Sequence, residues 1–232
     1  MFDVAELLTE YDRARAYTDQ LWRDLSAEEV CWRPNENSSA IGWHLGHQAH
    51  VAHFMVRNLT AAEPSPDPAL DQLMDSANPE PARGELPDLD RLISFRTTVA
   101  ERVHARMADI DQGRTGAPAQ LRIISQHLLT AVINHEYQHD RWIGEVRARD
   151  LGHALPDDPA SGRLTQVDGY IMIGSTFSTP LNDSSETSLL AGGSLTCPGL
   201  RGRRPARLVT GPTYPCPFGG NTGSRPFRPL RH

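Results

Sequence analysis

Residues 131–146 read AVINHEYQHDRWIGEV, and His135 and His139 lie one helical turn apart in this segment. Side chains four residues apart point the same way from an α-helix, because each residue turns the helix by about 100°. Several apolar residues share this side, within about 60° of His135: Leu121, Ile124, Leu128, Ala131, Val132, Trp142 and Val146. The pattern predicts a long helix whose buried stripe carries two imidazoles.

An earlier segment, SAIGWHLGHQAHVAHF over residues 39–54, carries a further histidine in the same setting. His47 is at the centre of an apolar stripe, and His44 and His50 flank it at about 60°. One buried histidine is usually satisfied by a core hydrogen bond. Three on facing stripes need a group that accepts their lone pairs, and a divalent metal is the simplest one. We therefore expect His47, His135 and His139 to be metal ligands, with open positions as in catalytic sites.

Four segments have helical periodicity, and together they predict the fold class. They cover residues 4–24, 39–59, 87–110 and 117–150. Residues 60–87 are rich in Pro, Asp, Ala and Glu, which is typical of a lid over a site or of a mobile connection. Four amphipathic helices with one long crossover connection predict an all-α four-helix bundle over residues 1–152.

The remaining sequence differs in character from the bundle. Residues 153–173 include LTQVDGYIMI, which we expect to form a short extension packed on the bundle. Residues 174–232 are rich in Ser, Thr, Gly and Pro and then in Arg, without periodicity. This composition predicts an irregular C-terminal tail that is disordered or atypical for the fold.

The charge and apolar content exclude some classes of partner. The net charge is −6, and all 29 acidic residues lie at or before Glu186, so the bundle is acidic and nucleic acid is not expected as a partner. The longest apolar runs are only a few residues, so no membrane span is predicted. The N-terminal residues are acidic and lack the basic and apolar regions of a secretory signal, which predicts a cytoplasmic protein.

Residues 135–139, HEYQH, also match the zincin motif HExxH, in which Glu136 would be the general base. The match lacks a third ligand downstream, since Arg141-Trp142-Ile143 stands where the extended motif would continue. A ferritin-like two-metal site is disfavoured as well, because it needs paired Glu-x-x-His segments. Metal-dependent hydrolysis stays a minor alternative.

The order of the motifs resembles the DinB-like superfamily. Residues 32–34 (WRP) precede AIGWHLGH at 40–47, and His135-x-x-x-His139 follows on the last bundle helix. The resemblance covers residues 1–152 and implies a four-helix bundle with a metal site at His47, His135 and His139. Several members are metal-dependent transferases for low-molecular-weight thiols, including mycothiol-dependent isomerases and bacillithiol transferases, and members often form homodimers.

A related domain forms the N-terminal part of ergothioneine-synthesising sulfoxide synthases, where it supplies the iron ligands. The fused C-type-lectin-like catalytic domain of those enzymes has no counterpart here, because the residues after the bundle are too few and of the wrong composition. Oxidative sulfur insertion is therefore not expected, although the histidine pattern is compatible with iron.

These observations favour a transferase that uses one divalent metal (Zn, Ni or Fe) and a small thiol such as mycothiol. The substrate would be an electrophilic small molecule. Glu136 and Gln138 are candidates for proton handling, and Arg96, inside an apolar stripe, is a candidate for binding a substrate carboxylate. Each also has a structural explanation, as a solvated flank or as an internally paired arginine. The alternative is a non-catalytic metal-binding protein with a role in stress or in protein interactions.

Overall fold

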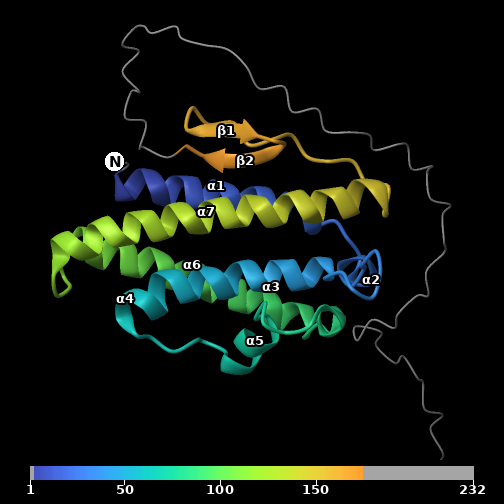
Figure 1. Cartoon of the computed structure of the whole chain (residues 1–232), viewed down its shortest axis with the longest axis horizontal. Coiled ribbons are helices and arrows are strands. Elements are labelled where there is room, and N and C mark those ends of the chain that lie inside the picture. Colours follow the sequence, from blue (N-terminus) through green and yellow to red (C-terminus); the bar gives the residue numbers. More distant parts are fainter. Residues whose placement is uncertain (1–2, 175–232) are drawn as a thin grey trace, which may run out of the picture.

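The computed structural model describes residues 3–174, and in it four long helical rods lie side by side (Figure 1). Their bounds are α1 Val4–Trp22, α3 Ile41–Ala52, α6 Leu89–Asp111 and α7 Pro118–Arg149. The rod of α3 continues through the π-helical turn η1 (His53–Asn58) into α4 (Leu59–Ala61). The expected all-α four-helix bundle is confirmed, while the π-helical turn replaces regular helix within the expected range 39–59.

Polar residues at the helix starts explain where the rods begin. Asp3 and Glu6 form a capping box at α1, in which each side chain accepts a hydrogen bond from the other residue's backbone N–H. The Asp88 side chain accepts a hydrogen bond from the backbone of Asp90 at the start of α6. Pro118 occupies the first turn of α7, where no backbone donor is needed.

The rods form a ring in which α7 contacts both α1 and α3. Thr18 bonds to Asp140 and Leu21 bonds to Arg147, so α1 and α7 run in the same direction. Figure 1 shows that α3 and α6 also run in the same direction. Parallel neighbours need a connection that returns along the bundle, which is the role of the segment between α4 and α6.

This connection is folded, which corrects the expectation of a mobile loop. It contains α5 (Pro68–Leu73) and the 3₁₀ turn η2 (Glu80–Gly84). Leu70 and Met74 are buried in the common core. The connection is thus part of the packed structure on the α3 side of the bundle (Figure 1).

Two glycines of α3 allow the connection to approach the helix closely. A Cβ atom at Gly42 would lie 2.6 Å from Cδ1 of Leu86, and one at Gly46 would lie 2.3 Å from Sδ of Met74. Side chains at these positions would displace their neighbours. The spacing Gly42-x-x-x-Gly46 therefore brings the connection against the helix that carries His47.

The segment after α7 forms a β-hairpin of β1 (Leu164–Val167) and β2 (Tyr170–Ile173). Its turn, Asp168-Gly169, has positive φ at both residues, as Asp-Gly turns in hairpins commonly do. The backbone N–H of Ile173 donates to Oδ1 of Asn134 at 2.8 Å, so the hairpin contacts α7. The expected tail, residues 174–232, lies outside the described residues except for Gly174.

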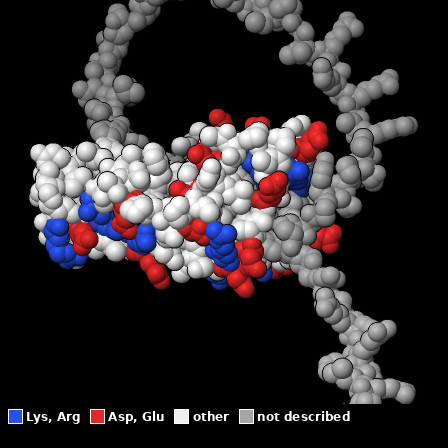
Figure 2. Space-filling view, turned by 90° about the horizontal axis from the view of Figure 1, so that it is seen from below, with Lys and Arg blue, Asp and Glu red and all other residues white. Residues whose placement is uncertain are grey.

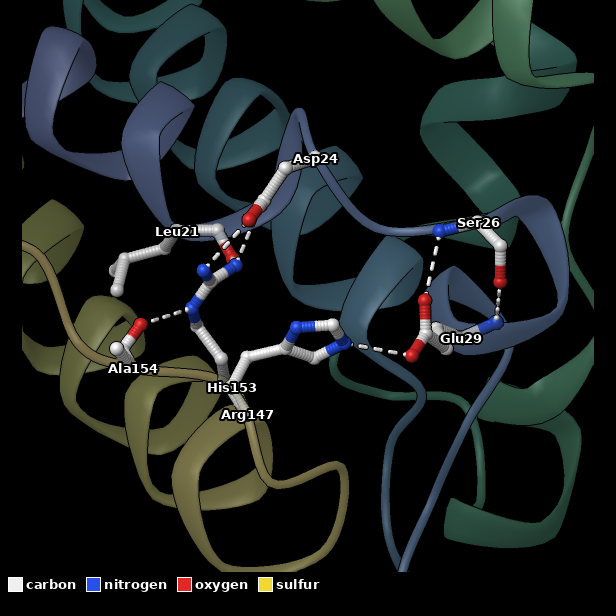
Figure 3. A network of polar contacts seen from close by, with 7 residues as sticks. All are labelled: Leu21, Asp24, Ser26, Glu29, Arg147, His153 and Ala154. Carbon is white, nitrogen blue, oxygen red and sulfur yellow. Dashed lines mark hydrogen bonds and ion pairs between the residues drawn. The ribbon is translucent and has the colours of Figure 1, made fainter.

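A polar clamp joins the C-terminal end of α7 to the segment after α1 (Figure 3). The Arg147 guanidinium donates to both carboxylate oxygens of Asp24, at 2.5 and 2.7 Å, and to the carbonyls of Leu21 and Ala154. Nearby, His153 contacts Glu29 of the short helix α2 (Ala27–Val30) at 2.7 Å. We call Arg147, the two carboxylate oxygens of Asp24 and the carbonyl oxygens of Leu21 and Ala154 the Arg147 clamp.

Acidic and basic side chains are interspersed on the face of the bundle that Figure 2 shows. Among residues 3–174, no helix combines the length and apolar character that a membrane crossing requires.

Candidate metal centre

The three histidines expected to be ligands come together at the interface between α3 and α7. One side-chain nitrogen from each of His47, His135 and His139 lies within 4.8 Å of the others. The Nε2 atoms of His135 and His139 are 3.0 Å apart. The 3.0 Å separation suits two nitrogens that bind one ion at about 2.0–2.1 Å, so the group could hold a divalent metal.

The His47 ring is held in place by its surroundings. Its Nδ1 lies 2.7 Å from the backbone carbonyl oxygen of Met74, to which it donates. The neutral ring then has its free lone pair on Nε2, the atom available to a metal. The Trp43 ring stacks on the imidazole at 4.5 Å between centroids and 12° between planes. The packed connection between α4 and α6 thus determines the tautomer of a ligand on α3.

His44 is an outer partner of the centre. Its Nδ1 is 2.7 Å from Nδ1 of His139, and both residues are buried. If Nε2 of His139 binds a metal, its Nδ1–H donates to His44, an arrangement that orients metal-bound imidazoles in many proteins. The sequence placed His44 on the flank of the stripe, and its spacing of three residues from His47 was the available signal.

The electrostatics of the cluster keep the rings neutral. Burial, together with the neighbouring histidines, lowers the pKa of His47 and of His135 to about 4 and that of His44 to about 3. Burial also holds the pKa of His139 well below its usual range. Neutral imidazole is the form that coordinates metals, so the donor set fits a divalent ion. Among the described residues, the buried Nδ1 atom of His135 has no hydrogen-bond partner.

The centre lies at the edge of the buried face of α7, which corrects the expected stripe. Ile124 and Trp142 are 50% and 42% exposed, whereas Ile133 and Ile143 are fully buried. The core side of α7 is therefore rotated by about 100° from the predicted one, toward the residues that follow each histidine. His135 is half-buried, so the cluster borders both the core and the solvent.

The other predicted site residues do not join the cluster. Glu136 is fully buried and lies near Thr18, with 3.4 Å between Oε2 and Oγ1, while Gln138 is exposed. Arg96 is buried and donates to the Leu45 carbonyl at 2.6 Å. Within residues 3–174, no hydrogen bond joins Glu136, Gln138 or Arg96 to the three histidines. The inward direction of Glu136 also counts against an HExxH peptidase, whose glutamate faces the metal-bound water.

Burial of Glu136 raises the pKa of its carboxyl group, and burial of Arg96 lowers the pKa of the guanidinium, while each charge favours the charged form of the other. These groups form a polar centre inside the bundle, next to the histidine cluster but separate from it.

Comparison with known proteins agrees with the geometry. The family model of the DinB superfamily matches residues 10–143, more than half of the chain. No curated protein matches the sequence. The match spans the bundle helices that carry His47, His135 and His139, and this superfamily typically binds metal. The chain belongs to the DinB superfamily.

Proposed function

We propose that this protein binds one divalent metal ion through His47, His135 and His139 and transfers a low-molecular-weight thiol to an electrophilic small molecule. The observation that carries the proposal is the convergence of three neutral imidazoles at the accessible edge of the bundle. Three protein ligands leave coordination positions open, as catalytic sites require.

The side chains around the cluster have distinct tasks in this proposal. A bound divalent ion supplies Lewis acidity, which lowers the pKa of a thiol at an open position. Met74 and His44 orient the rings of His47 and His139 through the hydrogen bonds to their Nδ1 atoms. The Trp142 ring lies 5.5 Å from the rings of both His44 and His139, so it forms an apolar wall that limits water beside the thiolate.

The candidates for proton handling and substrate binding have unequal support. Gln138 is exposed on α7, one residue before His139, where a bound substrate can reach it. Glu136 and Arg96 lie in the interior, and their contacts there support a structural role.

Metal content tests the ligand set. Purified protein is expected to contain about one divalent ion per chain, and His47→Ala and His135→Ala are expected to lose it. His104→Ala is the matched control, because His104 is a partly exposed histidine on α6 that contacts Asp12. Full metal content in both ligand variants would overturn the assignment.

A cobalt-substituted protein separates the transferase from the non-catalytic alternative. A thiol that enters the coordination sphere adds intense sulfur-to-cobalt absorption in the near ultraviolet. We expect this change when small thiols, including mycothiol, are added at about millimolar concentration, in the range of typical substrate affinities. A cobalt spectrum that no thiol changes would favour a metal-binding protein without thiol transfer.

A further inference from the structure

Each of the three histidines is followed by a polar residue that lies in the core. These residues are Gln48, Glu136 and Asp140, with exposed fractions of 0%, 0% and 2%. A residue is rotated by about 100° from the one before it on a helix. On α7 the histidines lie at the edge of the buried face, so the residue after each one points into the bundle, while Gln48 lies in a stretch of α3 that is buried throughout.

Gln48 connects these inward residues across the α3–α7 interface. Its Nε2 donates to the backbone carbonyl of Glu136 at 3.1 Å and to Oδ1 of Asp140 at 3.0 Å. Its Oε1 accepts from Nη1 of Arg96 on α6 at 3.0 Å. Both hydrogens of the amide group and its oxygen are therefore used.

The contacts of Asp140 extend the hydrogen-bond network to α1, the fourth long helix of the bundle. Oδ1 of Asp140 also accepts from Oγ1 of Thr18 on α1, at 2.7 Å. One hydrogen-bonded group thus links all four rods at the level of the histidine cluster. Buried hydrogen bonds are directional, whereas apolar side chains tolerate small shifts between helices.

The position of α3 along α7 decides whether the ligands meet. His47 comes from α3, and His135 and His139 come from α7. A slide between the two helices would move the His47 nitrogen away from the other two while leaving each helix intact. Metal ligands must be held within about 0.5 Å of their productive geometry, so this interface needs a specific anchor.

We infer that Gln48 is a positioning residue for the metal centre, which it serves by fixing the register of α3 against α7. The inference rests on the proposed metal binding. Gln48 touches neither the metal nor the substrate, and it acts through the backbone and side chains next to each ligand.

The test compares cobalt affinity and the visible cobalt spectrum in matched variants. Gln48→Met keeps the length of the side chain but removes its hydrogen bonds, and we expect about tenfold weaker cobalt binding with altered visible bands. Asp140→Asn keeps the acceptor oxygen for Gln48 and Thr18, so we expect the wild-type spectrum. Val103→Ala is the stability control, since this buried residue of α6 lies outside the network.

A purely structural role for Gln48 predicts a different pattern. Gln48→Met and Val103→Ala would then both lower the melting temperature and leave cobalt affinity and spectrum unchanged, which would overturn the inference. If Gln48→Met does not fold, Gln48→Glu serves in its place, because it keeps the acceptor for Arg96 and loses the donor toward α7.

Failure of metal binding is distinguishable from failure of the inference. If the wild type binds no cobalt, the proposed function fails, and the register is measured in the metal-free protein. The imidazole nitrogen shifts of His44 and His139 report their hydrogen bond. We expect Gln48→Met to shift these resonances and Val103→Ala to leave them in place, and equal spectra in Gln48→Met and the wild type would overturn the inference.

Discussion

Two polar clusters involve α7, and they differ in whether their groups are satisfied within the protein. In the Arg147 clamp, the guanidinium donates to a carboxylate and to two carbonyls, so its donors are matched by acceptors (Figure 3). In the histidine cluster, two Nε2 atoms face each other at 3.0 Å, and Nδ1 of His135 has no partner among the described residues. A cluster in which every donor has an acceptor stabilises the fold, whereas imidazole nitrogens that converge on one another provide a place for a metal ligand.

The largest expected effect is a loss of stability when the Arg147 clamp is removed. Arg147→Ala removes the pair with Asp24 and leaves the Leu21 and Ala154 carbonyls without this donor. We expect a loss of about 2 kcal/mol in unfolding free energy, discounted because Asp24 is largely exposed. Chemical denaturation measures this loss, and metal affinity should stay at the wild-type value.

Arg149→Ala is the matched control for the clamp. Arg149 is two residues further along, exposed, and paired with its neighbour Asp150. Its replacement should change the unfolding free energy by less than about 0.5 kcal/mol. Equal losses in the two variants would contradict a specific role for the clamp, and weaker metal binding in Arg147→Ala would contradict the separation of the two clusters.

A smaller effect, on affinity rather than stability, is expected at the histidine cluster. His44→Phe keeps a ring beside Trp142 but removes the partner of Nδ1 of His139. We expect about tenfold weaker cobalt binding, the lower end of the range for outer partners of metal ligands. His104→Phe is the control, because His104 pairs with Asp12 rather than with a ligand or its neighbours. The same loss of affinity in both variants would refute the assigned role of His44.

The smallest effect is a pH dependence of stability. The hydrogen bond from Arg147 holds the pKa of Asp24 below its usual value. A carboxylate with a lowered pKa in the folded state stabilises the protein above the unfolded-state pKa of about 4, and this contribution is lost as the pH falls through the folded-state value. Asp24→Asn should therefore cost up to about 1 kcal/mol at pH 7 and less at acidic pH.

Melting temperatures of the wild type and Asp24→Asn, measured between about pH 2 and pH 7, check this dependence. The difference between the two proteins should shrink on acidification. A difference that is independent of pH would mean that the Asp24 charge does not contribute through Arg147.

Some parts of the candidate metal centre could be predicted from the sequence, and others could not. His47, His135 and His139 were found because their spacing repeats the helical period amid apolar residues. The true buried face of α7 was missed because Glu136 is polar and was treated as a solvated flank, while the exposed Ile124 and Trp142 were counted as core. The polar residues that follow the three histidines, Gln48, Glu136 and Asp140, were the signal for the buried hydrogen-bond network between the helices.

The connection between α4 and α6 was missed for a compositional reason. Its prolines and acidic residues resemble a mobile loop, and it contributes few apolar residues, among them the buried Leu70 and Met74. Gly42 and Gly46 make room on α3 for Leu86 and Met74 of this connection, a contact between segments that no local pattern reveals.

The sequence by itself determined the four helices and the identity of the three histidines, because helical periodicity and ligand spacing are local properties of the chain. The tertiary structure decided what surrounds them. The Met74 carbonyl that orients His47, the pairing of His44 with His139 and the bonds of Gln48 across the interface all join residues more than 20 positions apart. Such contacts depend on how two helices pack and on their register. These properties involve two distant segments at once, so the pattern within one segment does not reveal them.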